Sequence, residues 1–195
     1  MIITEIKELD KKKKKIFIDG ECAFALYNGE IRKYQLKEDK ELSSEDYEEI
    51  LHEILDKRAK KRILYLLSDS AKTEYQLRKK LRNNFYPESS INVAIDYAKS
   101  YKYINDLDYA RQYIECKKNK LSKRQIESKL KERGIPENIL KLVFEGLHIN
   151  EEEIIQAYLK KKNIDVESIT PEEKKKVYGY FIRKGFSYEE IFKVF

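Results

Sequence analysis

Four side chains in this sequence could serve as zinc ligands or as a nucleophile with its base: Cys22, Cys116, His52 and His148. A structural zinc site needs four clustered ligands, whereas these four are scattered along the chain. The two cysteines form no Cys-x-x-Cys pair, so we interpret them as reduced thiols, with a disulfide as the alternative. His148 has no evident partner, and His52 lies in a strongly charged segment. Neither histidine is expected to act as a catalytic base.

A short run of oxygen ligands, Asn105, Asp106 and Asp108, could also suggest a metal site. We favour a structural interpretation, in which Asn105 or Asp106 caps a helix and Asp108 stabilises its positive end. The chain has no P-loop, GxGxxG, HExxH or GxSxG motif. We therefore expect no enzymatic activity, no cofactor and no metal.

The positive charge of the chain is concentrated in two segments. Residues 57–82 hold ten lysines and arginines against two acids, and residues 117–133 hold eight against two. Because the whole chain carries +6, the remainder is net negative. Two such basic helices could bind a phosphate backbone or an acidic protein groove. The other interpretation is a pair of solvated helix faces whose long side chains cover apolar surface, and we favour binding. The candidate contact residues are Lys72, Arg78, Lys79, Lys80, Arg82, Lys118, Lys123, Arg124, Lys129 and Arg133.

Tyrosine supplies much of the aromatic content, with fifteen tyrosines and no tryptophan. Tyrosines beside cations could stack nucleic-acid bases. At helical spacing they more often pack half-buried, which is the interpretation we favour here. The tyrosines interleaved with the basic segments are Tyr65, Tyr75, Tyr86, Tyr97, Tyr101, Tyr103, Tyr109 and Tyr113.

Composition indicates a mainly helical protein. Six glycines and three prolines in 195 residues suit helices joined by short connections. No apolar run approaches the roughly 18–20 residues of a membrane helix. The N-terminus also lacks the apolar core and cleavage site of a secretory signal. We expect a cytoplasmic monomer.

The N-terminal segment is the exception to the helical pattern. Asp19-Gly20 and Asn28-Gly29 are strong two-residue hairpin signals, because both central positions of a type I′ turn need positive φ. They predict an antiparallel β meander over about residues 2–37, with residues 31–34 in a strand. The run Lys11 to Lys15 is expected at a strand end or in a turn. We interpret it as a solvated segment, with a nucleic-acid contact as the alternative.

A repeat of about fifty residues fills the rest of the chain. Capping-box sequences, Ser or Thr followed three residues later by Gln or Glu, occur at 73–76, 122–125 and 170–173. Apolar positions match at an offset of 49 between the first two copies and 51 between the last two, with an insertion of about six residues near Asp165. Each copy predicts three helices, the middle one ending at Phe85, Gly134 or Gly185.

Stacked repeats bury the faces that a single copy cannot, so we expect an elongated, curved array. The predicted organisation is an N-terminal β-rich extension at 1–42 and a linker helix with the first repeat at 43–104. The second repeat follows at 105–149 and the third at 150–195.

Three blocks of sequence resemble the RecX regulatory protein family. They are Thr73-Glu74-x-x-Leu77-x-x-x-Leu81, Tyr103-Ile104-Asn105-Asp106-x-x-Tyr109-Ala110, and Ser122-x-x-x-Ile126-x-x-x-Leu130-x-x-Arg133-Gly134-Ile135. In the second block the family pattern is close to Gly-Tyr-Leu-Asp-Asp-x-x-Phe-Ala. Here Lys102 replaces the glycine, Ile104 the leucine, Asn105 the first aspartate and Tyr109 the phenylalanine. Lys72 is the nearest cation to the arginine that usually precedes the first block.

The resemblance covers about residues 50–195, and the β segment looks like the extension of some family members. It implies a cytoplasmic protein that binds the RecA recombinase filament and modulates it, usually by inhibition. ATP hydrolysis, strand exchange and the promotion of LexA cleavage in the SOS response would all be affected. Several family members also contact DNA. The alternative function is a helical-repeat DNA-binding module that acts without a recombinase.

Overall fold

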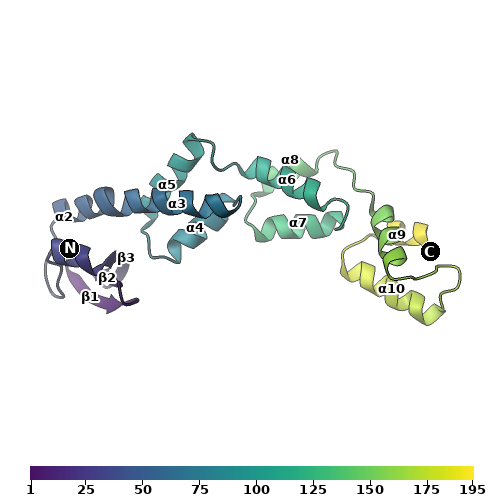
Figure 1. The fold of residues 1–195 in the computed structure, drawn as a ribbon, viewed down its shortest axis with the longest axis horizontal. Coiled ribbons are helices and arrows are strands. Elements are labelled where there is room, and N and C mark those ends of the chain that lie inside the picture. Colours follow the sequence, from purple (N-terminus) through teal and green to yellow (C-terminus); the bar gives the residue numbers. More distant parts are fainter. The chain divides into compact units, whose positions relative to one another are not determined.

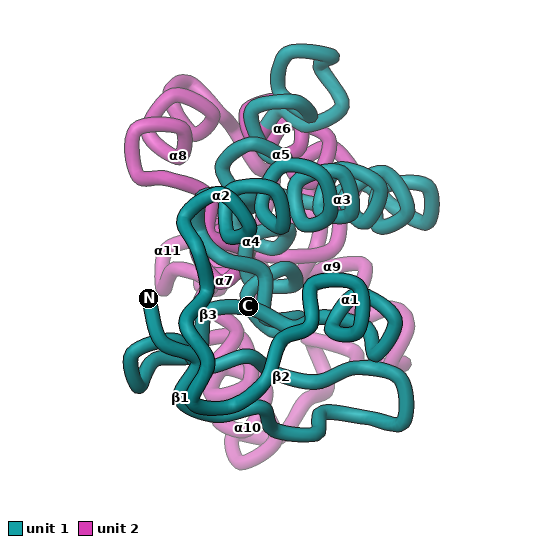
Figure 2. Tube along the Cα trace, turned by 90° about the vertical axis from the view of Figure 1, so that its left-hand side faces the viewer, with its two compact units in different colours: residues 1–105 teal, residues 106–195 magenta.

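A computed structural model describes residues 1–195 as two compact units, Met1–Asn105 and Asp106–Phe195 (Figure 2). The chain is mainly helical, with one small antiparallel sheet at its N-terminus and three three-helix repeats after it (Figure 1). The predicted fold class is therefore confirmed. None of the helices combines the length and the apolar composition that crossing a bilayer requires.

The sheet has three strands in the order β1-β2-β3, with β1 at Ile3–Glu8, β2 at Lys13–Ile18 and β3 at Glu21–Tyr27. Asp19 and Gly20 have φ values of 50° and 89° and form the turn between β2 and β3. This confirms the first predicted hairpin, since positive φ at both positions is the type I′ geometry.

The second predicted hairpin is wrong. Asn28-Gly29 opens helix α1, Asn28–Lys33, so residues 31–34 form no strand. The local turn signal is overridden by Glu30, whose Oε2 accepts the Tyr27 N–H at 2.7 Å and whose other oxygen pairs with Arg58. The third strand is β1 instead.

The lysine run also extends further into the sheet than expected. Lys11 and Lys12 lie in the turn before β2, but Lys13 to Lys15 lie inside the strand. Lys15 packs its ammonium 4.0 Å from the centre of the Phe85 ring, and Lys13 packs over the Tyr27 ring. At least two of these lysines therefore cover aromatic surface.

After α1 and a connection over residues 34–43, an unbroken helical stretch begins at Ser44. It comprises α2 at Ser44–Glu49, the π-helical segment η1 at Ile50–Asp56 and α3 at Lys57–Asp69. Ser43 caps its start by accepting the Asp46 N–H. Its buried residues Ile50 and Leu55 pack in one core with Ile16 and Phe24 of the sheet.

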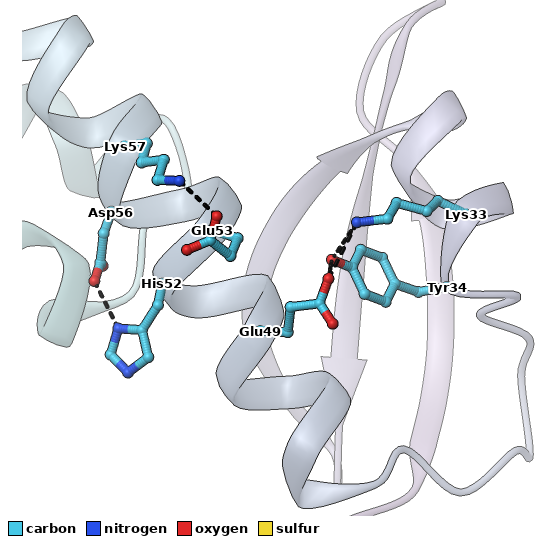
Figure 3. Close-up of polar contacts among 7 residues, drawn as sticks. All are labelled: Lys33, Tyr34, Glu49, His52, Glu53, Asp56 and Lys57. Atoms are coloured by element: carbon cyan, nitrogen blue, oxygen red, sulfur yellow. Dashed lines mark hydrogen bonds and ion pairs between the residues drawn. The ribbon is translucent and has the colours of Figure 1, made fainter.

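Polar contacts reinforce this packing (Figure 3). The Glu49 carboxylate accepts hydrogen bonds from the Tyr34 hydroxyl at 2.6 Å and the Lys33 ammonium at 3.1 Å, which lower the pKa of Glu49. His52 Nδ1 lies 3.0 Å from Asp56 Oδ2, a hydrogen bond that raises the pKa of His52. His52 is thus engaged with a carboxylate of its own helix.

The sheet is also fixed to the first repeat through β3. The Ala25 N–H donates to the Phe85 carbonyl at 3.2 Å, and Arg58 Nη1 donates to the Ala25 carbonyl at 3.3 Å. These bonds satisfy the outward-facing backbone groups of Ala25 at the free edge of β3, so further pairing is blocked at this position.

The first repeat consists of α3, α4 at Glu74–Arg82 and α5 at Glu88–Ser100. Its core joins Ile63 of α3, Leu77 and Leu81 of α4, and Ile91 and Ile95 of α5, all fully buried. The spacing of four between Leu77 and Leu81 places both on the inner face of α4.

The second and third repeats share one core in the second unit. Their helices are α6 (Asp106–Lys117), α7 (Lys123–Glu132), α8 (Glu137–Phe144), α9 (Glu151–Lys161), α10 (Pro171–Arg183) and α11 (Tyr188–Val194). The connection between α9 and α10 contains Asp165 and is longer than that between α6 and α7, as the expected insertion requires.

The helix ends follow the sequence closely. Capping boxes form at Thr73, Ser122 and Thr170. After the middle helices, Phe85, Gly134 and Gly185 have φ values of 59°, 76° and 79°. The predicted helix starts and left-handed helix ends are both confirmed.

Helix α5 ends in the same way at a residue that is not glycine. Lys102 has φ of 57°, its N–H donates to the Lys99 carbonyl at 2.9 Å, and the Tyr103 N–H donates to the Ala98 carbonyl at 2.8 Å. This is the Schellman arrangement, in which glycine is the usual left-handed residue.

Replacing Lys102 by glycine is therefore expected to raise the free energy of unfolding by about 1 kcal/mol, because a β-carbon is unfavourable at positive φ. Chemical denaturation of both proteins measures the change. Ser100→Gly is the control, since Ser100 lies two residues earlier, inside α5. This substitution should lower the free energy of unfolding by about 0.5 kcal/mol. A loss of stability in Lys102→Gly would contradict the assignment.

Candidate interaction surface

Two exposed lysines define the candidate surface on α4. Leu77 and Leu81 point into the core of the first unit, so Lys79 and Lys80 lie on the outer side of the helix. Neither ammonium takes part in an ion pair. Both are therefore free to bind an anion without first losing a protein partner.

The two arginines of α4 are engaged within the first unit. Arg78 Nε contacts Glu74 Oε1 at 2.7 Å, and its Nη1 donates to Asn92 Oδ1 at 2.7 Å. Arg82 donates to both carboxylate oxygens of Glu88, at 2.5 and 3.0 Å, and these bonds lower the pKa of Glu88. The charge of this segment is thus less available than its sequence suggests.

Lys72 is held close to its own turn. Its ammonium donates to the hydroxyl and carbonyl of Ser70 at 2.6 and 3.2 Å and lies 3.5 Å from Asp69. These groups are at the C-terminal end of α3, where a cation is favourable. The contacts support a capping role for Lys72.

The cations of α7 divide in the same manner. Lys123 and Arg124 are exposed and Lys129 is half-buried, and none of the three takes part in an ion pair. Lys129 occupies the position equivalent to Lys80 at the offset of 49. Both repeats therefore present a free lysine at the same place on the middle helix.

Lys118 and Arg133 have local partners in the second unit. Lys118 pairs with Glu115 at 2.7 Å. Arg133 donates to the Tyr109 hydroxyl at 3.2 Å and the Lys129 carbonyl at 2.9 Å, and its guanidinium lies 4.6 Å from the centre of the Tyr113 ring. Arg133 thus joins the end of α7 to α6.

The start of α7 meets the third repeat. The Ser122 hydroxyl donates to the Lys184 carbonyl at 2.7 Å, and the Lys123 N–H donates to Glu151 Oε1 at 2.7 Å. A β-carbon at Gly185 would lie 3.1 Å from Cβ of Arg124. Arg124 therefore contributes to packing between the repeats as well as to surface charge.

Gly185→Ala is expected to lower the free energy of unfolding by about 1–2 kcal/mol, because Gly185 combines a φ of 79° with this close approach. Thermal or denaturant unfolding measures the change. Gly29→Ala is the control, since Gly29 lies in helix α1 with open space around it, and should be neutral or stabilising. If Gly185→Ala left the free energy of unfolding unchanged, neither the positive φ nor the contact with Arg124 would contribute to stability.

A cleft of about 700 Å³ opens beside this contact within the second unit. Its lining combines the cations Lys123 and Arg124, the acids Glu151 and Glu190, and His148. Positive and negative groups are both present, so the cleft is not selective for an anion. This cleft could not be predicted from the sequence, because the residues that line it come from the second and third repeats.

The tyrosines do not all pack as expected. Tyr86 is buried, but four others are well exposed, with exposed fractions of 67% at Tyr65, 45% at Tyr75, 60% at Tyr101 and 49% at Tyr103. The packing interpretation is therefore wrong for these four residues. The remaining tyrosines of the set are half-buried.

The remaining candidate residues are the two cysteines and the run from Asn105 to Asp108. Cys22 and Cys116 are free and exposed. No group of three or more His, Cys, Asp or Glu side chains is placed to hold a metal ion. Helix α6 begins at Asp106, with Asp108 in its first turn, which agrees with the structural interpretation of these residues.

Comparison with protein families matches each repeat separately. The first, second and third three-helix domains of RecX match residues 59–97, 105–141 and 150–195. Together these matches cover all three helical repeats.

Whole-chain relatives carry the same description. The regulatory protein RecX of Caldanaerobacter subterraneus subsp. tengcongensis is 36% identical, over 99% of this chain and 98% of its own. That of Clostridium beijerinckii is 29% identical, over 97% and 91%.

Solved structures agree in fold. A crystal structure of regulatory protein RecX aligns with a TM-score of 0.61 at 21% identity, covering 99% of this chain and 98% of that one. RecX from Lactobacillus salivarius aligns with a TM-score of 0.58 at 22% identity, covering 71% and 93%. On the family matches and the full-length relatives, the chain belongs to the RecX family of regulatory proteins.

Proposed function

We propose that this protein binds the RecA–DNA filament and inhibits it, lowering ATP hydrolysis, strand exchange and the promotion of LexA cleavage. The proposal follows from membership of the RecX family. The observation that supports a binding mechanism is the pair of equivalent free lysines, Lys80 and Lys129, on the middle helices of two repeats.

Free lysines suit this task for an energetic reason. An exposed ion pair is worth only about 0–1 kcal/mol, but a cation already paired, such as Arg82, must still give up that partner before it binds another anion. Lys79, Lys80, Lys123 and Lys129 do not incur this cost. We assign them the main contacts with acidic filament surface or with the phosphates of its DNA.

The mode of action would be association rather than catalysis, in the cytoplasm and as a monomer. Direct contact with single- or double-stranded DNA would be secondary to contact with the recombinase. A DNA-binding module independent of a recombinase is the competing function, and the same lysines would serve it.

Binding to assembled filaments tests the proposal against this alternative. RecA of the same organism is assembled with ATP on single-stranded DNA, and the protein is pelleted with the filaments at about 150 mM salt. The control contains the same DNA without RecA. We expect strong association with filaments and weak association with bare DNA. Equal association with both would favour the DNA-binding module.

A further inference from the structure

Three tyrosine rings gather at the C-terminal end of α5 in the first unit. The centres of the Tyr97 and Tyr101 rings are 4.9 Å apart, and those of Tyr101 and Tyr103 are 5.6 Å apart. The Tyr101 and Tyr103 rings are nearly parallel, with 13° between their planes. We refer to these three residues as the tyrosine cluster.

The backbone holds this cluster in place. Tyr97 and Tyr101 are four residues apart on one side of α5. The left-handed turn at Lys102 then reverses the chain and returns Tyr103 beside Tyr101, with its N–H bonded to the Ala98 carbonyl at 2.8 Å. The next residue, Ile104, is buried in the core and anchors the turn. The rings are therefore positioned before any ligand arrives.

The cluster exposes aromatic surface that packing does not use. Tyr101 and Tyr103 are 60% and 49% exposed, whereas Tyr86 of the same repeat is buried in the core. A stacked and exposed pair of rings can extend its stack with another planar ring.

Two lysines accompany the cluster. The Lys60 ammonium lies 5.6 Å from the centre of the Tyr97 ring, and the exposed Lys102 stands between Tyr101 and Tyr103 in the sequence. A ligand that combines flat aromatic rings with nearby negative charge would satisfy the rings and the lysines together. Unpaired nucleotides have this combination, whereas in duplex DNA the base faces are already stacked.

We propose that the tyrosine cluster stacks the unpaired bases of single-stranded nucleic acid. This proposal rests on the secondary DNA contact of the proposed function and refines it, because it assigns the contact to named residues and to unpaired bases. It also uses different residues from the free lysines of α4 and α7, whose ammonium groups can recognise only negative charge.

The test compares two fluorescently labelled oligonucleotides of equal length and charge, one of thymidine nucleotides and one of abasic sites. Anisotropy of each is measured with the full-length protein at low salt. Because stacking is worth about 1–3 kcal/mol per base, the thymidine strand is expected to bind about 5- to 100-fold more tightly. Equal binding of the two strands, or binding of neither, would overturn the proposal.

Variants assign the preference to the cluster. Tyr101→Ala with Tyr103→Ala should remove the preference for bases and leave binding of the abasic strand unchanged, and circular dichroism verifies that the variant is folded. Tyr101→Phe with Tyr103→Phe should retain the preference, because stacking needs the ring and not the hydroxyl. Tyr188→Ala, a tyrosine 71% exposed on α11, is the matched control and should behave as wild type.

Two further outcomes would contradict the assignment. If the double alanine variant keeps the preference, the bases bind elsewhere. If it instead loses filament binding with no change in the preference, the cluster contacts protein. Failure of the RecA proposal alone would leave the oligonucleotide result intact, so the two proposals can be separated.

Discussion

Replacing Lys79, Lys80 and Lys129 together by glutamate is expected to raise the concentration needed for half-inhibition of RecA ATP hydrolysis by about 100-fold. Each reversal removes an attraction and adds a repulsion, together about 1 kcal/mol for an exposed charge, so three supply about 3 kcal/mol. The measurement is a titration of the variant into RecA filaments hydrolysing ATP. Circular dichroism should be unchanged, because none of the three lysines takes part in an ion pair.

The control reverses three other lysines to match the total charge. Lys37, Lys175 and Lys176 are exposed, take part in no ion pair and lie outside α4 and α7. Their replacement by glutamate should shift inhibition much less. An equal shift in both variants would mean that net charge, rather than the lysines of the middle helices, carries the interaction.

Phe181→Ala is expected to have the largest effect on stability, lowering the free energy of unfolding of the second unit by about 3–5 kcal/mol. Phe181 is 1% exposed and contacts Phe186, Tyr158 and Tyr180, with ring centres 5.2–5.3 Å away. Truncation would leave a cavity in the part of the shared core that the third repeat supplies. Denaturant unfolding followed by circular dichroism measures the change.

Phe192→Ala is the matched control for this prediction. Phe192 lies on α11 of the same unit but is 76% exposed, so its truncation should change stability by less than about 0.5 kcal/mol. Similar effects of the two variants would show that Phe181 does not have the central place in the core assigned to it.

Much of the helical fold was predictable because it depends on local interactions. The capping boxes at Thr73, Ser122 and Thr170 involve residues only three apart, and each helix begins where its box predicts. Left-handed helix ends at Gly134 and Gly185 follow equally local rules. Because the sequence repeats, the helices predicted in one copy also supported those predicted in the other two.

The errors occurred where distant residues decide the local structure. Asn28-Gly29 is a local hairpin signal, but Glu30 pairs with Arg58, which lies 28 residues further along the chain, and α1 forms instead. The π-helical segment η1 gives no pattern that distinguishes it from an α-helix. Its buried residues pack in one core with the sheet.

The candidate surface could be located in the sequence but only partly resolved into free and engaged cations. The pairs Arg78–Glu74 and Lys118–Glu115 follow helical spacing, whereas two other contacts do not. Arg82 donates to Glu88 across the turn between α4 and α5, and Arg78 donates to Asn92 on α5. Neither pairing follows from helical spacing. For the tyrosines, the sequence offered stacking and packing as alternatives, and helical spacing favoured packing. That spacing does not extend past the left-handed turn at Lys102, after which Tyr103 returns beside Tyr101.

Inhibition of the recombinase is the central claim, and ATP hydrolysis tests it most directly. The wild-type protein is titrated into RecA of its own organism, assembled on single-stranded DNA with ATP at near-physiological salt, and binding to the same DNA alone is measured in parallel. We predict that hydrolysis falls at protein amounts well below those that coat the DNA. Unchanged hydrolysis, with DNA binding intact, would contradict the account and favour a DNA-binding module with the RecX fold.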